Sequence, residues 1–600
     1  MLKIEQIFSS VLNQTRTIRI LLPDNYDNTK KYPVLYMHDA QNIFDDAIAF
    51  GNCGWKVSEV IKSLKGDSLI DDIIVVGIDN IEERFTDYSP WVHDSIIKRG
   101  VGCGGNGHLY ADFIGLELKH YIDDNYATSK RYEDTYMVGS SMGAYITLYT
   151  GIKYKEYFST LGIFSIASWF NEKALLDFID GSIVNTKQRF FISVGTNETS
   201  DDTYKDFNEV YLKNSENIYD ALSKKTNNIF YKVIEKGIHN EKTWREILPS
   251  FLLYANNTIT SPINLVLDQF KTKRIVFLGE DHRIKEHLIF LKESLETLFL
   301  NDIRYLGMEF GANEDQEALN KLLTSKSFNR EKGRKLLFNY NVTIPFKEYL
   351  DLYEEINRIN NKYNPKKPML IINLSYIFNW KEKLKPVTPK IRKTIFHKGN
   401  IEYFRANLIE EFINDTFNTK VLILTGTVHA FTNYKYYFVD ADSINFMRKY
   451  QTNFGHLVYE RFPTITNTIL FNQPTMTWIQ DELVPSKLGN GIIEALADKY
   501  QLYPAGINFA GIFGNIRDDS YYSIGYHHFN IGRLANGLIL LKPLNQLHGA
   551  TIEYEFVNHL SFQEIYNRYP DPHWHIPPKD ITEYWELIKT YQKLDYDKIR

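Results

Sequence analysis

Continuous apolar segments that alternate with amphipathic ones restrict the fold of this chain more than any other feature of its sequence. Several short segments within the first 255 residues are apolar throughout, which is typical of strands buried on both faces of a parallel sheet. Longer segments at residues 110–126 and 241–255 carry apolar residues at helical spacing. The pattern predicts an α/β fold with a mostly parallel sheet covered by helices on both faces. The predicted strands are residues 15–23, 32–39, 71–79, 134–140, 160–168, 189–196 and 229–235.

The stretch at residues 256–268 interrupts this rhythm, and a second series of strand-like and helix-like segments follows it. A chain of 600 residues is too long for one ordinary hydrophobic core, so more than one domain is expected. We predict α/β domains at residues 1–258 and 269–600, and the second includes an irregular part after residue 450. The second series contains predicted strands at residues 273–281, 302–311, 368–375 and 420–429 and predicted helices at 285–300 and 313–325.

Composition and charge argue against several classes of function. The formal net charge of -5 at pH 7 provides no basic field that would attract nucleic acid. The two cysteines, Cys53 and Cys103, are too few for a disulfide framework. The N-terminal residues lack the apolar core of a secretory signal, and no segment of about 18 apolar residues is present to span a bilayer. We therefore expect a cytoplasmic protein that acts on a small molecule and contacts neither nucleic acid nor a membrane.

The segment VGSSMGA, residues 138–144, places a serine where a predicted strand turns into a predicted helix. Ser141 has glycine two residues before it and two residues after it, at Gly139 and Gly143, whereas Ser140 does not. A nucleophile at such a turn has a strained backbone, and small neighbours relieve the crowding around it. The Met142 N–H at the start of the helix is available to stabilise developing negative charge. The spacing therefore predicts Ser141 as a nucleophile with Met142 in its oxyanion hole.

A serine nucleophile needs a general base and an acid that orients the base, and in α/β enzymes both follow the serine in the chain. His239 lies in a loop between a predicted strand and a predicted helix, from which an imidazole can reach the strand ends. The acid should follow the preceding strand, where Glu198, Asp201 and Asp202 lie. Glu198 is closest to the strand end and is our choice, while Asp201 and Asp202 stay open as alternatives that could instead cap the next helix.

Five segments of the first half resemble the esterase family that contains the enterochelin-type and related serine esterases. They are YPVLYMHDAQNIFDD, IIVVGIDN, GGNGHLYADFIGLELKHYID, MVGSSMGA and GIHNEKTWREILP, and the similarity runs over nearly all of residues 15–255. The resemblance implies an α/β-hydrolase fold with Ser141 as nucleophile and His239 as base. It also implies that the HDAQN stretch supplies the second oxyanion-hole N–H, at Gln41. Relatives tend to have glycine at the position of Ala40, and because alanine resists a positive φ, we expect this loop to differ from theirs.

Titratable residues follow three predicted strands of the second series at the points where the strands end. Glu280 and His282 follow the first strand, Glu309 ends the second, and His429 follows the third. Because the carboxyl ends of parallel strands meet at one crevice, these side chains are expected to converge. Two carboxylates and two imidazoles could perform acid/base chemistry or hold a metal ion.

The same segments resemble the erythromycin esterase-like superfamily, which is related more distantly to ChaN-like and TraB/Tiki-like proteins. GEDH, LGMEFG, FRANLIEEF and TGTVHAF carry the similarity, which extends from about residue 270 to residue 550. The resemblance implies His282 as a general base with Glu280, Glu309 and His429 around it, and Arg405 matches a basic position ahead of the last strand. One residue separates Glu280 from His282, which is closer than in macrolide-hydrolysing relatives and argues against a macrolide substrate.

The two domains differ in the cofactors that they are expected to use. The glycine-rich residues 101–108 follow SIIKRG rather than an apolar strand, so they indicate no nucleotide, and no cofactor is expected in the N-terminal domain. Some branches of the second superfamily bind metal or haem and others need neither, so the cofactor of the second domain stays open. The histidines at 527, 528, 573 and 575 lack a carboxylate or cysteine partner at ligand spacing and are expected to be ordinary surface or packing residues.

We predict a carboxylic ester hydrolase that works through a Ser-His-acid triad and is fused to a second, hydrolase-like domain with a Glu/His site. One alternative is an iron-acquisition protein in which the first half cleaves a siderophore ester and the second binds haem or a metal. The other is a non-catalytic binding or signalling protein on degenerate hydrolase folds. The intact set of Ser141, His239 and Glu198 argues against that alternative.

Overall fold

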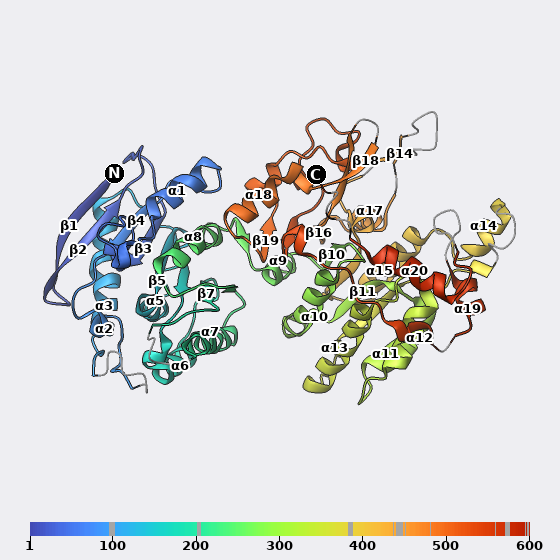
Figure 1. The fold of residues 1–600 in the computed structure, drawn as a ribbon, viewed down its shortest axis with the longest axis horizontal. Helices are drawn as coiled ribbons and strands as arrows, with labels where there is room; N and C mark the ends of the chain where they lie inside the picture. The colour runs from blue at the N-terminus through green and yellow to red at the C-terminus, as the bar shows by residue number, and fades with distance from the viewer. Residues whose placement is uncertain are drawn as a thin grey trace. The chain divides into compact units, whose positions relative to one another are not determined.

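The computed structural model describes residues 1–94, 102–200, 206–381, 388–435, 437–439, 448–450, 452–479, 482–558, 560–569 and 577–594, together with Tyr596 and Ile599. The chain forms two compact units, and Figure 1 shows its helices and strands. The first unit comprises Met1–Ser261 and the short segment Lys499–Leu502. The second comprises Pro262–Asp498 and Tyr503–Arg600. Nothing in the sequence pattern predicts that Lys499–Leu502 belongs with the first unit.

The first unit, coloured blue to green in Figure 1, is built around an eight-stranded sheet with the order β1-β2-β4-β3-β5-β6-β7-β8. The strands from β4 to β8 in this order are parallel to one another, whereas β2 pairs antiparallel with both β1 and β4. Strand β5 therefore has parallel neighbours on both sides, and its carboxyl end opens onto the same edge as theirs. The strands of this unit are β1 (Leu2–Ser9), β2 (Gln14–Leu21), β3 (Val34–His38), β4 (Ile74–Ile78), β5 (Thr135–Ser140), β6 (Thr160–Phe164), β7 (Arg189–Gly195), β8 (Ile229–Ile234) and the short β9 (Ile259–Thr260).

Helices cover both faces of this sheet. Successive residues of a strand point to opposite faces, and two adjacent residues of β7 show this arrangement. Phe190 belongs to a buried cluster with Tyr110 and Leu148, whereas the ring centre of Phe191 lies 5.9 Å from that of Phe251. Tyr110 is on α3 and Leu148 is on α5, whereas Phe251 is on α8, so α8 packs on the opposite face of the sheet from α3 and α5. The helices are α1 (Val57–Gly66), α2 (Arg84–Asp87), α3 (Gly107–Asp112), α4 (Lys119–Asn125), α5 (Met142–Lys153), α6 (Glu172–Gly181), α7 (Phe207–Ser223) and α8 (Glu241–Ala255).

The second unit contains a sheet in which the strands run in the order β12-β11-β13-β10-β16-β20-β19. All neighbours in this order are parallel except β19 and β20. Strands β11, β13 and β10 are adjacent, so the residues at their carboxyl ends share one edge of the sheet. The strands are β10 (Ile275–Glu280), β11 (Tyr305–Ala312), β12 (Leu370–Ser375), β13 (Val421–Gly426), β16 (Thr466–Phe471), β19 (Ala505–Asn508) and β20 (Gly537–Leu540), with separate antiparallel pairs β14 (Tyr437–Val439) with β15 (Arg448–Tyr450) and β17 (Thr475–Ile479) with β18 (Glu482–Ser486).

Helices also pack on both faces of the second sheet. In β10, Val276 and Leu278 belong to a buried cluster with Leu288 of α10, while the Phe277 ring centre lies 5.0 Å from that of Phe454 in α17. The helices of this unit are α9 (Pro262–Gln269), α10 (Lys285–Leu300), α11 (Gln316–Leu323), α12 (Arg330–Tyr340), α13 (Lys347–Tyr363), α14 (Pro389–Ile395), α15 (Ile401–Asp415), α16 (Thr427–Ala430), α17 (Phe454–Arg461), α18 (Ile492–Lys499), α19 (Phe562–Arg568) and α20 (Ile581–Gln592). None of the helices in the described parts of the chain is long and apolar enough to cross a membrane.

The α/β class predicted for both halves is confirmed, and each predicted strand corresponds to an observed one. Several observed strands were not predicted from the sequence, among them the antiparallel β1 and the central β16; the others are β9, β14, β15 and β17–β20. The helical segment predicted at residues 110–126 is divided, because a π-helical stretch at Phe113–Leu118 separates α3 from α4. The apolar run at residues 536–543 forms β20, so the irregular part after residue 450 contributes strands to the second sheet.

Candidate active sites

Ser141 lies at the junction between β5 and α5 with backbone angles φ 56° and ψ -122°. A positive φ is unfavourable for a residue with a Cβ, so the surrounding backbone must hold Ser141 in this conformation. A Cβ on Gly139 would lie 2.3 Å from the carbonyl oxygen of Gly143, which explains why glycine is needed there. The Met142 N–H is the first of α5, and the leading N–H groups of a helix have no acceptor within the helix.

Glu198 and His239 are in contact at the ends of β7 and β8. The His239 Nδ1 atom lies 3.0 Å from Glu198 Oε2. The other carboxylate oxygen accepts hydrogen bonds from the Ser165 hydroxyl at 2.6 Å and from the Gly195 N–H at 2.5 Å. Glu198 is only 1% exposed, so these bonds fix the carboxylate in place. The two alternative acids at positions 201 and 202 lie outside the described residues.

Aromatic side chains that the sequence did not single out hold the His239 ring. The Tyr211 ring centre lies 4.6 Å from that of His239, and the Tyr211 hydroxyl lies 3.4 Å from His239 Nε2. Trp244 packs edge-on against the imidazole with 5.0 Å between ring centres, and its Nε1 donates to the Ser165 hydroxyl at 2.8 Å. Tyr211 is on α7 and Trp244 is on α8, where apolar spacing alone assigns aromatic residues to the core.

Ser141 and His239 line the same cavity, which has a volume of about 750 Å³. Burial raises the pKa of Glu241, another lining residue, to about 7. The candidate oxyanion residues Met142 and Gln41 also line this cavity. Aromatic residues form much of the remaining wall, namely Phe50, Trp55, Phe85, Trp169 and Trp244.

In the loop after β3, the left-handed backbone conformation occurs beside Ala40 rather than at it. Ala40 begins a short 3-10 helix, η1 (Ala40–Asn42), and the residue with the positive φ is Asp39, at φ 57° and ψ 48°. Ala40 itself does not adopt a positive φ, which agrees with the resistance of alanine to that conformation. Space for its methyl group comes from β4, because a Cβ on Gly77 would lie 2.7 Å from the Ala40 Cβ.

In the second unit, His282 is held at its Nδ1 atom by the carboxylate of Glu280 at 3.0 Å. The Tyr349 hydroxyl of α13 donates to the same Glu280 oxygen at 2.7 Å. Glu280 ends β10 and is 2% exposed, so the pair is anchored in the sheet. The His282 ring packs edge-on against Phe310, with 4.5 Å between ring centres. Tyr349 was not identified from the sequence, because it lies on a helix 69 residues away from Glu280.

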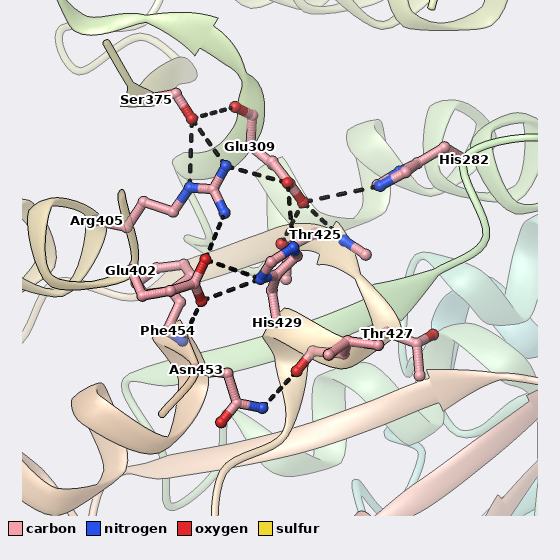
Figure 2. A network of polar contacts seen from close by, with 12 residues as sticks. His282, Glu309, Ser375, Glu402, Arg405, Thr425, Thr427, His429, Asn453 and Phe454 are labelled. Atoms are coloured by element: carbon pink, nitrogen blue, oxygen red, sulfur yellow. Dashed lines mark hydrogen bonds and ion pairs between the residues drawn. The ribbon is translucent and has the colours of Figure 1, made fainter. Parts of the chain in front are cut away.

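The Glu309 carboxylate lies between Arg405 and His282 in Figure 2. Its Oε1 accepts a hydrogen bond from Arg405 Nη2 at 3.1 Å, and its Oε2 lies 3.9 Å from His282 Nε2. Oε2 also accepts from the Thr425 hydroxyl at 2.6 Å and from the Gly426 N–H at 2.9 Å, both at the end of β13. Strands β11 and β13 and helix α15 therefore meet at this one carboxylate.

His429 mirrors His282 on the other side of Glu309. Its Nδ1 lies 3.0 Å from the Glu402 carboxylate, and its Nε2 lies 3.6 Å from Glu309 Oε1. Glu402 also accepts from the Phe454 N–H at 2.6 Å and from Arg405 Nη1 at 3.4 Å. Each histidine is thus fixed at Nδ1 by its own glutamate and directs Nε2 toward a shared one (Figure 2). Glu402 was not identified from the sequence, because it precedes the FRANLIEEF segment, although it lies on the same helix α15 three residues before Arg405.

Charge pairing outweighs burial at each of these groups. Burial alone would raise the pKa of Glu309, but the charges of Arg405, His429 and His282 hold it well below its ordinary value. Burial lowers the pKa of His282, yet the bond to Glu280 and the charges of both glutamates raise it overall. Burial also lowers the pKa of His429, but the charges of Glu309 and Glu402 raise it overall. The second unit therefore favours protonated imidazoles beside an ionised Glu309.

The described residues contain no group of three or more His, Cys, Asp or Glu side chains arranged to hold a metal ion. Glu309 illustrates the reason, since Arg405, Thr425 and Gly426 already use its lone pairs. Two of the histidines considered as metal ligands, those at 573 and 575, lie outside the described residues.

Comparison with known proteins gives one family match and several similar proteins and structures. Residues 9–255 match the family model Esterase, described as "Putative esterase". Two proteins of Bacillus subtilis (strain 168), Uncharacterized protein YbbA and Uncharacterized protein YjcH, are each 25% identical to this chain, over 251 and 250 residues respectively. These alignments cover 41% of this chain and 95% and 92% of the two relatives.

Two solved structures illustrate the structural matches. An IroE-like serine hydrolase from Shewanella oneidensis is 18% identical with a TM-score of 0.35, and the match covers 60% of this chain and 99% of that one. The enterobactin esterase FES from Shigella flexneri, in the presence of enterobactin, is 18% identical with a TM-score of 0.34. That match covers 42% of this chain and 58% of the esterase.

Proposed function

We propose that the first unit is a serine esterase that hydrolyses a carboxylic ester of a small molecule. The observation that carries this proposal is the strained Ser141, which shares a cavity with an imidazole held by a buried carboxylate. The family match of residues 9–255 supports the same class of reaction.

The reaction proceeds through an acyl-enzyme. His239 Nε2 takes the proton of the Ser141 hydroxyl as the oxygen attacks the ester carbonyl, and Glu198 holds the imidazole by its Nδ1–H. The N–H groups of Met142 and Gln41 stabilise the oxyanion of the tetrahedral intermediate. The imidazolium then gives its proton to the leaving alcohol, and water, activated by the same histidine, releases the acid. No cofactor takes part in these steps.

Replacing Ser141 by alanine tests this proposal against a matched neighbour, Ser140. Ser141→Ala is expected to lower the kcat for p-nitrophenyl acetate by about 10⁴-fold or more, because no nucleophile remains. Ser140→Ala is expected to keep kcat within about threefold, because this hydroxyl has no step in the mechanism. Steady-state kinetics on a panel of short p-nitrophenyl esters measures both. Equal activity of the two variants would sink the proposal.

We further propose that the second unit carries an acid/base site of the hydrolytic type. The specific observation in its favour is the pair of histidines that are each fixed at Nδ1 and directed at Glu309. A raised imidazole pKa suits a group that donates and accepts protons near neutral pH. His282 is proposed as the proton-transfer group, with its side chain 19% exposed beside the 30% exposed side chain of His429.

A Ser141→Ala background separates the second site from the first. Any ester hydrolysis that remains there is expected to fall by about 100-fold on adding His282→Ala, because a general acid/base group is lost. Kinetics on the ester panel provides the measurement, and a haem absorbance band or stoichiometric metal in the isolated protein favours the iron-acquisition alternative. If the residual hydrolysis is unchanged by His282→Ala, His282 is not the proton-transfer group of the second site.

A further inference from the structure

The loop that would supply the second oxyanion donor packs beside the start of α5. A Cβ on Gly143 would lie 3.2 Å from Asp39 Oδ2 and 3.6 Å from the His38 Cβ. Asp39, Gln41 and Ser141 all line the same cavity. The conformation of the turn after β3 therefore decides where its N–H groups lie relative to the proposed nucleophile.

Asp39 is the strained residue of this turn, since its left-handed conformation costs about 1 kcal/mol for a residue with a Cβ. Three neighbours hold it there. Its N–H donates to the Tyr88 hydroxyl at 3.2 Å, and its carboxylate accepts two hydrogen bonds from Arg84, from Nε at 2.6 Å and from Nη2 at 2.8 Å. The Asn80 side-chain amide binds Oδ1 as well.

The Gln41 side chain is also committed to the loop after β4. Its Nε2 donates to the Asn80 carbonyl oxygen at 2.8 Å, and its Oε1 accepts from the Asn80 N–H at 3.0 Å. With the side chain closed in this way, the backbone N–H is what Gln41 can offer to an oxyanion. Asn80 thus binds both Asp39 and Gln41 of the turn. Arg84 neutralises the charge of the Asp39 carboxylate, which is buried because Asp39 is only 7% exposed.

From this geometry we propose that the Asp39–Arg84 ion pair is a positioning device for the oxyanion hole, and that Arg84 is a positioning residue of the esterase site. The proposal rests on the proposed esterase function of the first unit. Arg84 fixes the Asp39 carboxylate in a bidentate contact, Asp39 fixes the left-handed turn, and the turn fixes the Gln41 N–H. A loosened turn would leave substrate binding intact and weaken the stabilisation of the tetrahedral intermediate.

Arg84→Gln tests this in the full chain, with Arg19→Gln as its matched control. Arg19 makes an equivalent bidentate ion pair with Asp79, at 2.6 and 2.9 Å, and neither of these residues lines the cavity. For p-nitrophenyl acetate, Arg84→Gln is expected to lower kcat by about 100-fold with KM changed by less than about threefold, the size of effect seen when one oxyanion donor is lost. Its affinity for an aromatic boronic acid, which mimics the tetrahedral intermediate, is expected to fall by a similar factor. Arg19→Gln is expected to leave both quantities within about twofold.

Arg84→Lys, which keeps the charge but loses the bidentate contact, is expected to lie between wild type and Arg84→Gln. It also keeps the test decisive if Arg84→Gln does not fold. Wild-type kcat and boronate affinity in the Arg84 variants would overturn the proposal, as would a loss confined to KM, which marks a substrate contact. Failure of the esterase function itself is distinguishable, because it appears as an inactive wild-type protein or an active Ser141→Ala variant, and it overturns this proposal too.

Discussion

Replacing Glu198 by glutamine is expected to lower the kcat for ester hydrolysis by about 10⁴-fold while leaving the fold intact. The amide oxygen can still accept the hydrogen bonds from Ser165 and Gly195 that the carboxylate accepts now. The amide NH₂ group, however, becomes a donor that faces His239 Nδ1, where the carboxylate lies 3.0 Å away. It therefore stabilises the imidazole tautomer that carries its proton on Nε2, and that tautomer cannot accept the Ser141 proton.

Glu241→Gln is the matched control for this change, because Glu241 is a glutamate in the wall of the same cavity. It contacts Asn42 rather than His239, with Asn42 Nδ2 at 3.2 Å from its Oε1. Its kcat is expected to stay within about tenfold of wild type, since it has no place in proton transfer. Steady-state kinetics with circular dichroism as a check of folding measures both. A Glu198→Gln variant with activity near wild type would show that another acid, or none, orients His239.

The second large effect concerns stability. Arg405→Met is expected to destabilise the second unit by about 3–5 kcal/mol, because it removes the buried guanidinium that pairs with two buried carboxylates. Arg405 is 2% exposed and lies 3.1 Å from Glu309 and 3.4 Å from Glu402. Adding Glu309→Gln to Arg405→Met is expected to recover part of the loss, because it removes one of the buried charges that has lost its guanidinium partner. Hydrogen exchange of peptides from α15 and β11, followed by mass spectrometry in the full chain, measures the local free energy of opening.

Arg330→Met is the control for this change, because Arg330 also pairs with several carboxylates, at 2.8 to 3.1 Å, but its side chain is 26% exposed. Its effect is expected to be about 1 kcal/mol or less, as is usual for ion pairs that water screens. If Arg405→Met proved as mild as Arg330→Met, the Glu309 network could not be the anchor of this part of the second unit.

Much of both candidate sites could be predicted because it lies at the ends of parallel strands. Ser141 and Glu198 lie at or just beyond apolar strands of the first sheet, and Glu280 ends an apolar strand of the second sheet. Each sheet brings the residues at its own strand ends to one edge. Local sequence therefore contains the signal for these residues. The glycines two residues before and after Ser141 are a further local signal. The structure explains this spacing, because Gly139 and Gly143 lie so close together that a Cβ on Gly139 would clash with the Gly143 backbone.

The rest of the sites depends on contacts between distant segments, which no local pattern encodes. Tyr211, Tyr349 and Glu402 lie on helices, where their spacing is that of ordinary core or surface residues. In the loop after β3 the sequence drew attention to Ala40, whereas the residue with the positive φ is Asp39. Asp39 tolerates a positive φ because Arg84, 45 residues away in sequence, holds its carboxylate. A single sequence does not reveal such a partner.

The most direct test of the proposed esterase site is covalent labelling of the full chain with a fluorophosphonate, followed by mass spectrometry of its peptides. The probe reacts with a serine only where a base and an oxyanion hole activate it. We predict one adduct per chain, on Ser141, that is absent from Ser141→Ala and retained in Ser140→Ala. An adduct on another residue, or labelling that persists in Ser141→Ala, would contradict Ser141 as the nucleophile.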